Sequence, residues 1–545
     1  MVNYSIFIFV SLFLFHQKGL AQDRYAIHFK YKPTELYRLD EPENLLGKRA
    51  LERRSKEGMA VDSTDIPVSE KYISSTASLV NDFLYHSKWL NASIVVAEEK
   101  NLLAIADLDF VDKVVLVAKG GLKSSQSSKK ENLSRINKKI KKIFWEDQSF
   151  EFQNNILGIP DMHQEGYNGE GVRIAVFDAG FLNVDEISGM QHLFEEKKII
   201  ATRDFVNSAS EDVFKRDTHG TGSLSLLAAY DPEKLIAGAY ESEYVLCITE
   251  DVDSENRIEE YNWVRAAEFS DSLGVDIINS SLGYNFFDDP EMNYTKEDLD
   301  GETAVISIGA AMAAKKGILV VSSTGNEGNI DWQTITVPAD AKGILSVGAI
   351  NNNFEKAAFS SVGPSSDGRI KPELVAFGSG VTLWRYSNGT SFSSGTSFSA
   401  PQIAALAAGL WQAHPEWTRS QLKERLIASG SQFDEPDSEL GYGVPNYLRA
   451  MYGTVDDLER KLVIPTPKVY PNPLDHQQLF IEFGNASNCL FKLFNTTGNL
   501  VTYLSLARND IQAPYEVELP LVHPGVYLIE LEDDSGASTI KLLRK

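Results

Sequence analysis

The feature that most constrains the fold is a regular alternation of short apolar runs with helix-like stretches between residues 154 and 452 of the 545-residue chain. Five of these runs are apolar on both faces, at residues 172–177, 244–248, 277–280, 318–322 and 345–348. Strands of this kind are typical of a parallel sheet that helices cover on each side. The sequence therefore predicts a doubly wound α/β domain, whose ligands bind at the carboxyl ends of the strands.

The N-terminus carries the pattern of a signal peptide at residues 1–21. An apolar run from Ile6 to Phe15 precedes Gly19-Leu20-Ala21, which suits a cleavage site, although no Lys or Arg comes before the run. The run is well short of the ~20 residues that a membrane-spanning helix needs. We therefore expect export and a soluble mature chain without a transmembrane segment. The alternative is that the apolar run serves as a short membrane anchor.

Composition divides the rest of the chain around the predicted α/β domain, to which we assign residues 146–455. Residues 22–118 mix strand-like and helix-like pieces, which predicts a small α+β domain. Residues 119–145 are rich in Ser and Lys and indicate an exposed linker, either a plain connector or a site of cleavage during maturation. Residues 456–468 contain two prolines and indicate a stiff linker. Residues 469–545 carry only strand and turn signals, which predicts a β-sandwich.

Charge and cysteine content narrow the function. The formal net charge of −24 argues against nucleic acid as a partner. The two cysteines, Cys247 and Cys489, fall in different predicted domains, so we expect no stabilising disulfide. Neither cysteine has a neighbouring metal or redox pattern, and we expect both to be buried apolar residues.

Three motifs place an acid, an imidazole and a hydroxyl in the α/β domain. Asp178 directly follows the run at 172–177, where a carboxylate can orient a histidine. His219 lies in Asp-Thr-His-Gly-Thr-Gly, before a helix-like stretch at 223–229, and the glycines allow close approach to its ring. Ser397 lies in Ser-Gly-Thr-Ser-Phe-Ser-Ala-Pro, before an Ala-rich helix expected at 402–411. The structural alternatives are a helix cap for Asp178 or Ser397 and a core histidine for His219.

An oxyanion would form when Ser397 attacks a carbonyl group. Exposed backbone amides and the positive end of the following helix can stabilise that charge. Asn326, in Ser-Thr-Gly-Asn-Glu-Gly at the end of another apolar run, could donate its side-chain amide to the same oxyanion. The alternative is an asparagine that serves only a turn.

Together these segments resemble the four signature blocks of the subtilisin-like serine proteases, or subtilases, in that family's Asp, His, Ser order. The block that ends at Ala400-Pro401 is very specific, the asparagine block is moderately specific and Asp-Ala-Gly is weak. The resemblance implies a secreted serine endopeptidase that works through an acyl-enzyme. It gives the roles of orienting acid, general base, oxyanion donor and nucleophile to Asp178, His219, Asn326 and Ser397.

Two departures from the family pattern indicate a divergent branch. Ser225 stands where the family usually has Gly, and Ala179 stands where it usually has Ser or Thr. Neither residue touches an atom that transfers a proton, so we expect activity to be kept and the detailed specificity to differ.

The resemblance also implies a peptide-binding site. Residues 279–284 resemble the family's substrate-binding strand, whose main chain would pair with an extended peptide. Glu327 is similar to an acidic residue on the rim of the primary specificity pocket, which favours a basic or polar residue before the scissile bond; a merely solvated Glu is the alternative. The substrate-binding residues expected from these segments are Ser280, Ser281, Leu282, Gly283, Gly325 and Glu327.

No cofactor and no catalytic metal are required for this chemistry. Subtilases often bind structural calcium, but this sequence has no Asp-rich loop with clear ligand spacing.

The flanking regions resemble two further modules. Residues 45–100 are similar to the propeptide of subtilases from the Bacteroidetes group, and residues 469–473, 525–527 and 541–545 are similar to the sorting domain of that group's type IX secretion system. The implied partners are protein or peptide substrates, the chain's own propeptide and the type IX machinery. The enzyme would cross the outer membrane and be secreted or held at the cell surface.

Three alternatives remain open. The chain could be a non-catalytic surface adhesion or binding protein on a subtilase scaffold, and its C-terminal region a passive binding module. A lipase or esterase is the weakest, because Ser399 stands where Gly-x-Ser-x-Gly needs its second glycine.

Overall fold

The structure is a computed structural model, and it describes residues 22–33, 37–120, 150–207, 210–387, 389–453, 468–482, 488–507, 514–520, 522–533 and 536–545. The chain divides into two compact units, Met1–Gly453 and Thr454–Lys545, which are described separately. The predicted signal peptide, nearly all of the predicted basic linker and most of the Pro-containing linker lie outside the described residues.

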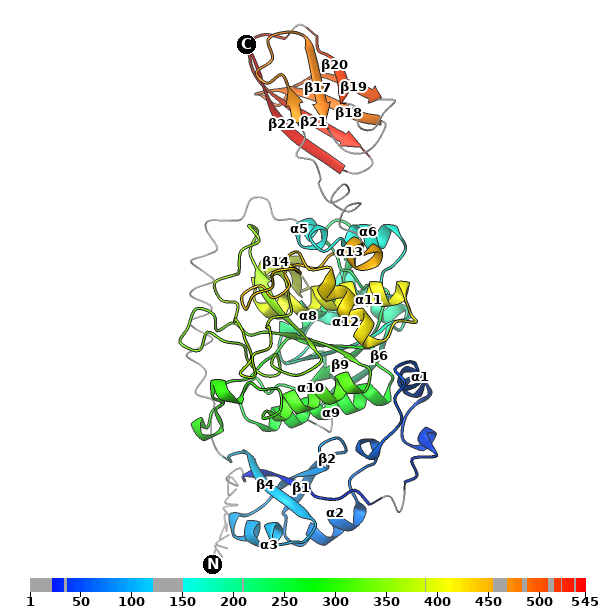
Figure 1. Ribbon diagram of the computed structural model, residues 1–545, viewed down its shortest axis with the longest axis vertical. Helices are drawn as coiled ribbons and strands as arrows, with labels where there is room; N and C mark the ends of the chain where they lie inside the picture. The colour runs from blue at the N-terminus through cyan, green and yellow to red at the C-terminus, as the bar shows by residue number, and fades with distance from the viewer. Residues whose placement is uncertain are drawn as a thin grey trace, which may run out of the picture. The chain divides into compact units, whose positions relative to one another are not determined.

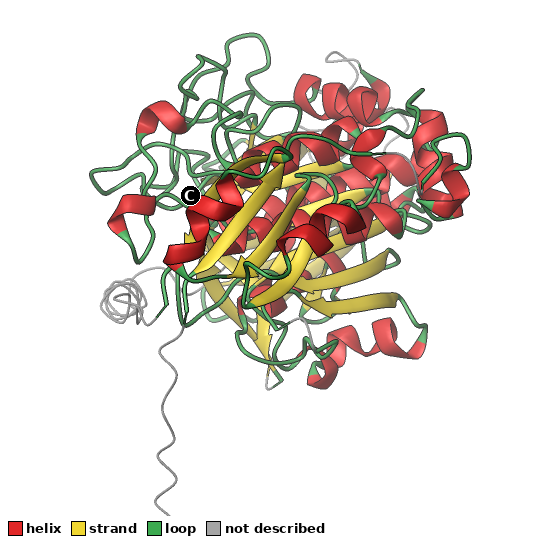
Figure 2. Ribbon diagram, turned by 90° about the horizontal axis from the view of Figure 1, so that it is seen from below, coloured by secondary structure: helices red, strands yellow, loops and turns green. Residues whose placement is uncertain are grey.

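A seven-stranded parallel sheet forms the centre of the first unit (Figures 1 and 2). In spatial order its strands are β13 (Leu374–Phe377), β12 (Leu345–Ile350), β11 (Leu319–Ser323), β10 (Ile277–Ser280), β5 (Arg173–Asp178), β9 (Glu243–Ile248) and β6 (Ile199–Asp204). All five apolar runs are strands of this sheet, which confirms the predicted fold. Sequence analysis missed β6, whose residues are mostly half-buried at the sheet edge, and the short β13.

Helices cover both faces of the sheet, as Figure 1 shows. On one face α9 (Ile258–Ser272) packs against α10 (Val305–Lys315), and on the other α8 (His219–Ala228) packs against α11 (Ala400–Ala413). The remaining helices of this domain are α5 (Phe150–Asn155), α6 (Ile159–Gln164), α7 (Gln191–Glu195), α12 (Arg419–Ala428) and α13 (Tyr447–Tyr452). Two short hairpins add β7 (Tyr230–Asp231) with β8 (Leu235–Ile236) and β14 (Ser379–Tyr386) with β15 (Gly389–Ser394).

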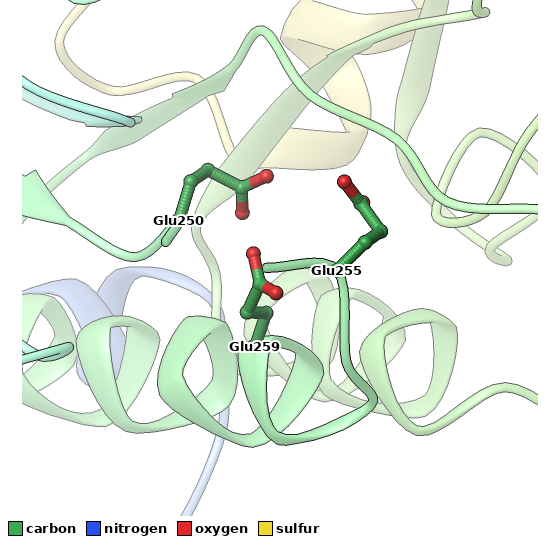
Figure 3. Close-up of side chains that lie close together, drawn as sticks. All are labelled: Glu250, Glu255 and Glu259. Carbon is green, nitrogen blue, oxygen red and sulfur yellow. The ribbon is translucent and has the colours of Figure 1, made fainter. Parts of the chain in front are cut away.

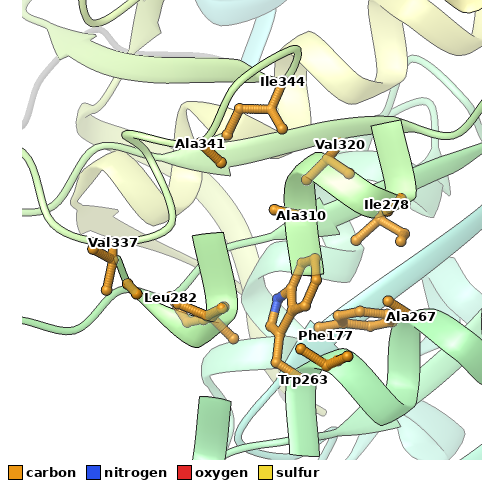
Figure 4. Close-up of a cluster of buried hydrophobic side chains, with 14 of the residues drawn as sticks. Phe177, Trp263, Ala267, Ile278, Leu282, Ala310, Val320, Val337, Ala341 and Ile344 are labelled. Atoms are coloured by element: carbon orange, nitrogen blue, oxygen red, sulfur yellow. The ribbon is translucent and has the colours of Figure 1, made fainter. Parts of the chain in front are cut away.

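One hydrophobic core of the first unit fills the layer between the sheet, α9 and α10 (Figure 4). Phe177 of β5 meets Trp263 of α9 edge to face, with ring centroids 5.3 Å apart. The Trp263 indole donates a 3.0 Å hydrogen bond to the Ser280 hydroxyl, so the polar atom of this buried ring is satisfied. This packing fixes the ends of β5 and β10, from which the site is built.

The N-terminal domain is an antiparallel sheet with three helices, which confirms the predicted α+β domain. Its strand order is β2 (Asp82–Ser87), β3 (Ala92–Val96), β1 (Arg24–Phe29) and β4 (Val111–Ala118). Its helices are α1 (Lys48–Lys56), α2 (Glu70–Thr76) and α3 (Leu102–Ala106). One sheet face packs on its own helices around Ile27 and Val95, and the other packs on Tyr261 of α9.

The second unit is made of two antiparallel sheets, which confirms the predicted β-rich region. One sheet contains β16 (Lys468–Tyr470), β17 (Gln478–Glu482) and β20 (Tyr515–Glu518); the other contains β19 (Leu500–Ala507), β18 (Asn488–Asn495), β21 (Gly525–Asp533) and β22 (Gly536–Arg544). Alternate residues of β18, such as Phe491 and Leu493, are buried, as expected for a strand with one face in a core.

Two further expectations concern cysteines and membranes. Cys247 and Cys489 are both free and buried, as predicted. Among the described helices, none combines the length and the apolarity that crossing a membrane requires.

Candidate active site

Asp178 and His219 form a hydrogen-bonded pair at the carboxyl end of β5. His219 Nδ1 lies 2.8 Å and 3.0 Å from the two carboxylate oxygens of Asp178. Asp178 is almost fully buried and also accepts bonds from the Ala179 N–H at 2.8 Å and the Ser223 hydroxyl at 3.2 Å. A Cβ at Gly220 would lie 2.8 Å from Asp178 Cβ, so glycine permits this approach. The carboxylate therefore bonds to three groups, the Ala179 N–H, the Ser223 hydroxyl and the His219 imidazole.

The electrostatics of His219 reflect this pairing. Burial acts to lower its pKa, but the charge of Asp178 and the hydrogen bond to it prevail, so the pKa of His219 is raised above its ordinary value of 6.5. A bond to Asp178 through Nδ1 leaves Nε2 free to take a proton. The helix α8 begins at His219 itself, four residues before the predicted start. The imidazole is therefore carried by the first residue of a helix.

Ser397 lies in a single 3₁₀ turn, Thr396–Phe398, rather than at the surface of a helix start. The following helix begins at Ala400, two residues earlier than predicted, and Ser397 is 8% exposed. The N–H groups of Phe398 and Ser399 bond to Gly395 and Thr396, while in the described structure the Ser397 N–H has no acceptor. That N–H is therefore available to an oxyanion beside the hydroxyl.

The described structure has no hydrogen bond between the Ser397 hydroxyl and His219. The neighbouring Phe398 ring lies 5.4 Å from the His219 ring, which places the turn beside the imidazole. In free enzymes the nucleophile–base bond is often long and tightens when substrate binds.

Asn326 is fixed by its side-chain oxygen. Its Oδ1 accepts hydrogen bonds from the Thr396 N–H at 2.9 Å and the Thr396 hydroxyl at 3.2 Å. Because Oδ1 is engaged by donors, the amide orientation is set and Nδ2 points away from Thr396. Among the described residues Nδ2 has no acceptor, and Asn326 is exposed, so this amide is open to a ligand.

The predicted substrate strand is shorter than its sequence pattern suggested. The Ser280 side chain points into the core toward Trp263, and the main chain of Tyr284 is already bridged to Val337 in both directions. The Ser281 hydroxyl donates a 2.8 Å bond to the Ser397 carbonyl. This leaves the main chain of Leu282 and Gly283 without partners in the described structure, and a Cβ at Gly283 would lie 2.2 Å from Thr336 Oγ1.

Gly325 and Glu327 lie together at the edge of the site. Gly325 has a φ of +103°, and a Cβ there would lie 2.4 Å from Glu327 Oε2. The Ser361 hydroxyl donates a 3.1 Å bond to the same carboxylate. Glu327 is therefore held over Gly325 rather than free in solvent.

Three acidic side chains lie close enough to share a cation in the described part of the chain: Glu250, Glu255 and Glu259 (Figure 3). Their donor atoms all lie within 4.8 Å of one another. Burial, followed by repulsion from neighbouring carboxylates, raises the pKa values of Glu250 and Glu259. Sequence analysis missed this cluster because it comes from a strand end, a loop and a helix start, without the spacing of a calcium loop.

Sequence analysis also missed Ser223 and Arg385. Ser223, which bonds to Asp178, lies four residues after His219 on one face of α8, a spacing that could have revealed it. Arg385 of β14 lies over the Phe398 ring beside His219, but it is far from His219 in sequence and no local pattern points to it.

Three segments match known protein families. Residues 169–443 match the subtilase family, residues 24–134 the Bacteroidota propeptide domain of the same peptidases, and residues 468–545 a secretion system C-terminal sorting domain. Subtilisin NAT of Bacillus subtilis subsp. natto is 27% identical over 290 residues, which cover 52% of this chain and 67% of that protein. A subtilisin of Bacillus pumilus is also 27% identical, over 52% of this chain and 92% of its own. The crystal structure of MycP1 without its N-terminal propeptide aligns with a TM-score of 0.44 and 21% identity, over 56% of this chain and 98% of that one.

Proposed function

The chain belongs to the subtilase family and is a serine-type endopeptidase, and we propose that it hydrolyses peptide bonds through an acyl-enzyme on Ser397. Asp178 and His219 complete the triad, and Asn326 donates to the oxyanion. The observation that carries this assignment is the pair of bonds from His219 Nδ1 to the buried Asp178 carboxylate, which leaves Nε2 free in an imidazole that lies beside the turn of Ser397.

The proposed reaction moves one proton at a time through His219. Its Nε2 takes the proton of the Ser397 hydroxyl as Oγ attacks the scissile carbonyl carbon, and Asp178 stabilises the imidazolium. The negative oxygen accepts hydrogen bonds from the Ser397 N–H and Asn326 Nδ2. The C–N bond then breaks as His219 gives its proton to the leaving amine. Water repeats the cycle on the acyl-enzyme and frees Ser397, so the proposed chemistry needs no metal or cofactor.

We place the acyl part of the peptide along Ser281–Gly283. The unpaired main chain of Leu282 and Gly283 supports an added strand, and the bond from Ser281 to the Ser397 carbonyl brings that strand to the nucleophile. The carboxylate of Glu327, held over Gly325, supports a preference for a basic or polar residue before the scissile bond. Ser280 contributes only by holding the strand end.

The protein is made with its own propeptide and is exported by type IX secretion, as its terminal domains indicate. We propose that residues 22–118 inhibit the peptidase until cleavage occurs between Lys119 and Trp145, so that the mature catalytic domain begins near Glu146. Contacts of β2 and the turn after it with α9 support the inhibition: Glu268 accepts bonds from the Ser87 hydroxyl at 2.6 Å and the Trp89 N–H at 2.9 Å. Release or retention at the cell surface would follow export.

Labelling with a serine-reactive organophosphonate tests the proposal. The mature enzyme should be labelled once, at Ser397, and Ser397→Ala should lose both labelling and peptidase activity while keeping its circular dichroism spectrum. A folded wild-type protein that is neither labelled nor active would instead support a non-catalytic binding protein.

A further inference from the structure

We propose that Arg385 binds a carboxylate on the first residue after the scissile bond, so that the enzyme prefers substrates with Asp or Glu at that position. This inference rests on the proposed triad and adds a specificity determinant on the side of the leaving peptide.

Arg385 lies beside the catalytic histidine although it is 166 positions away in sequence. Its guanidinium carbon is 5.2 Å from the centroid of the Phe398 ring, and that ring is 5.4 Å from the His219 ring. Gly222, three residues after His219 on α8, leaves the space that Arg385 fills: a Cβ there would lie 3.4 Å from Arg385 Nε. The charge of Arg385 also acts on His219, against the carboxylates of Asp178 and Asp217.

The main chain next to Arg385 is fixed by Ser225, one of the departures from the family pattern. The Ser225 hydroxyl donates a 2.7 Å bond to the Gly222 carbonyl and accepts a 3.0 Å bond from the Trp384 N–H. It thereby ties α8 to β14 at the residue that precedes Arg385. The Trp384 side chain is buried against Gly189, which holds the strand on its other side.

The guanidinium of Arg385 lacks a carboxylate partner within the described residues. Its Nε is buried and has no hydrogen-bond acceptor there. In contrast, the buried Arg53 and Arg54 both pair with Asp271. A half-buried guanidinium with a free, fork-shaped donor set is suited to a carboxylate that arrives with the substrate.

The position of Arg385 indicates the leaving side of the cleaved bond. His219 gives its proton to the leaving amine, so the residue after the scissile bond must lie next to the imidazole. The acyl side runs along Ser281–Gly283, and Arg385 has no described hydrogen bond or ion pair with that segment. Arg385 instead covers α8 beside His219, where the side chain of the leaving residue would lie.

Peptide cleavage by mature enzyme tests this inference. The substrates share one sequence with an amidated end and differ only after the scissile bond, where they carry Asp, Glu, Asn, Gln, Ala or Lys. A charge-assisted pair predicts kcat/KM about 10- to 100-fold higher for Asp and Glu than for Asn and Gln. A second set that ends at Ala, as free acid or as amide, separates a side-chain carboxylate from a chain terminus; preference for the terminal carboxylate alone would overturn the Asp and Glu preference.

Variants then assign the effect to the side chain. R385Q should bring the acid-to-amide ratio to about 1, and R385E should favour Lys over Glu. Arg425 of α12, whose guanidinium lies over the Trp417 ring, offers a matched control, and R425Q should keep the wild-type ratio. A wild-type ratio near 1, a ratio that survives in R385Q, or an equal loss on every peptide in R385Q would overturn the inference.

Active-site titration separates this inference from the proposed function. All rates are referred to enzyme labelled at Ser397 by the organophosphonate. Absence of labelling overturns the proposed triad and this inference together, whereas full labelling without an acid preference overturns this inference alone.

Discussion

Asp271 of α9 is a buried carboxylate that bonds two arginines of the N-terminal domain at once. One oxygen pairs with Arg53, and the other lies 2.8 Å from Arg54 Nη2. Arg54 also reaches Asp65, which in turn pairs with Lys316 at the end of α10 at 2.7 Å. These side chains are nearly inaccessible to solvent, so their charges depend on one another.

We expect this pairing to decide how tightly the propeptide binds. Removing one member of a buried ion pair costs about 3–5 kcal/mol, which is about 10²- to 10⁴-fold in affinity. The separated 22–118 segment should inhibit mature enzyme when it is added back, and its R53A variant should need a correspondingly higher concentration. The measurement is the inhibition constant against a chromogenic peptide.

The matched control is Arg38→Ala in the same segment. Arg38 pairs with Asp40, but both side chains are about two-thirds exposed, so its loss should change inhibition little. Equal effects of R53A and R38A would contradict the prediction.

The sequence predicted the acidic and amide parts of the site better than the helical parts. Asp178 and Asn326 follow continuous apolar runs, and such runs locate strand ends well. The sequence predicts the start of α8 too late because Gly220 and Gly222 are poor helix formers, whereas packing against β14 and α11 overrides that local preference.

Contacts between distant segments could not be predicted from one sequence. Ser225 departs from the family pattern in sequence, but only the structure shows that its hydroxyl accepts a hydrogen bond from the Trp384 N–H. Likewise, the burial of Ser397 follows from a 3₁₀ turn, and short turns of this kind have little sequence signal.

Asp178 should govern the pH dependence of catalysis. The proposed base must be neutral, so kcat/KM should fall as pH drops through the pKa of His219, which lies above 6.5. Asp178→Asn removes the charge that raises this pKa, so the acid limb should move to lower pH while kcat falls about 10⁴-fold, as measured when the corresponding Asp of another serine protease is replaced. The test is a kcat/KM profile from pH 5 to 9.

Ser223→Ala is the control for this change. It removes one 3.2 Å hydrogen bond to Asp178 but keeps the carboxylate charge, so the acid limb should move less and the rate should fall by about tenfold or less. A D178N profile with an unshifted acid limb would be inconsistent with His219 as the titrating base.

Asn326 should act on turnover rather than on binding. Asn326→Ala removes Nδ2 and should lower kcat by about 10²- to 10³-fold with little change in KM, a magnitude measured on subtilisin itself. Asn326→Asp keeps an oxygen that can accept from Thr396 but has no amide donor, so it should be at least as slow. A defect confined to KM would make Asn326 a turn residue.

The Glu250 cluster should make stability depend on pH. Because burial and neighbouring carboxylates raise the pKa of Glu250 in the folded protein above the ordinary 4.5, folding favours its protonated form. The stability that protonated Glu250 contributes to the fold is fully present below pH 4.5 and is lost as pH rises through the pKa of the folded protein. In a Ser397→Ala background, which prevents self-cleavage, Glu250→Gln should therefore raise Tm at pH 8 by about 2 °C or more and change it little at pH 4. The substituted side chain keeps an oxygen that can accept from the Tyr284 hydroxyl.

The control for this change is Glu211→Gln. The Glu211 side chain is 82% exposed, so its replacement should leave Tm unchanged at both pH values. If the three carboxylates instead hold calcium, the signs reverse: Glu250→Gln would lower Tm at pH 8, and a chelator would lower the Tm of the Ser397→Ala parent but not that of the double variant.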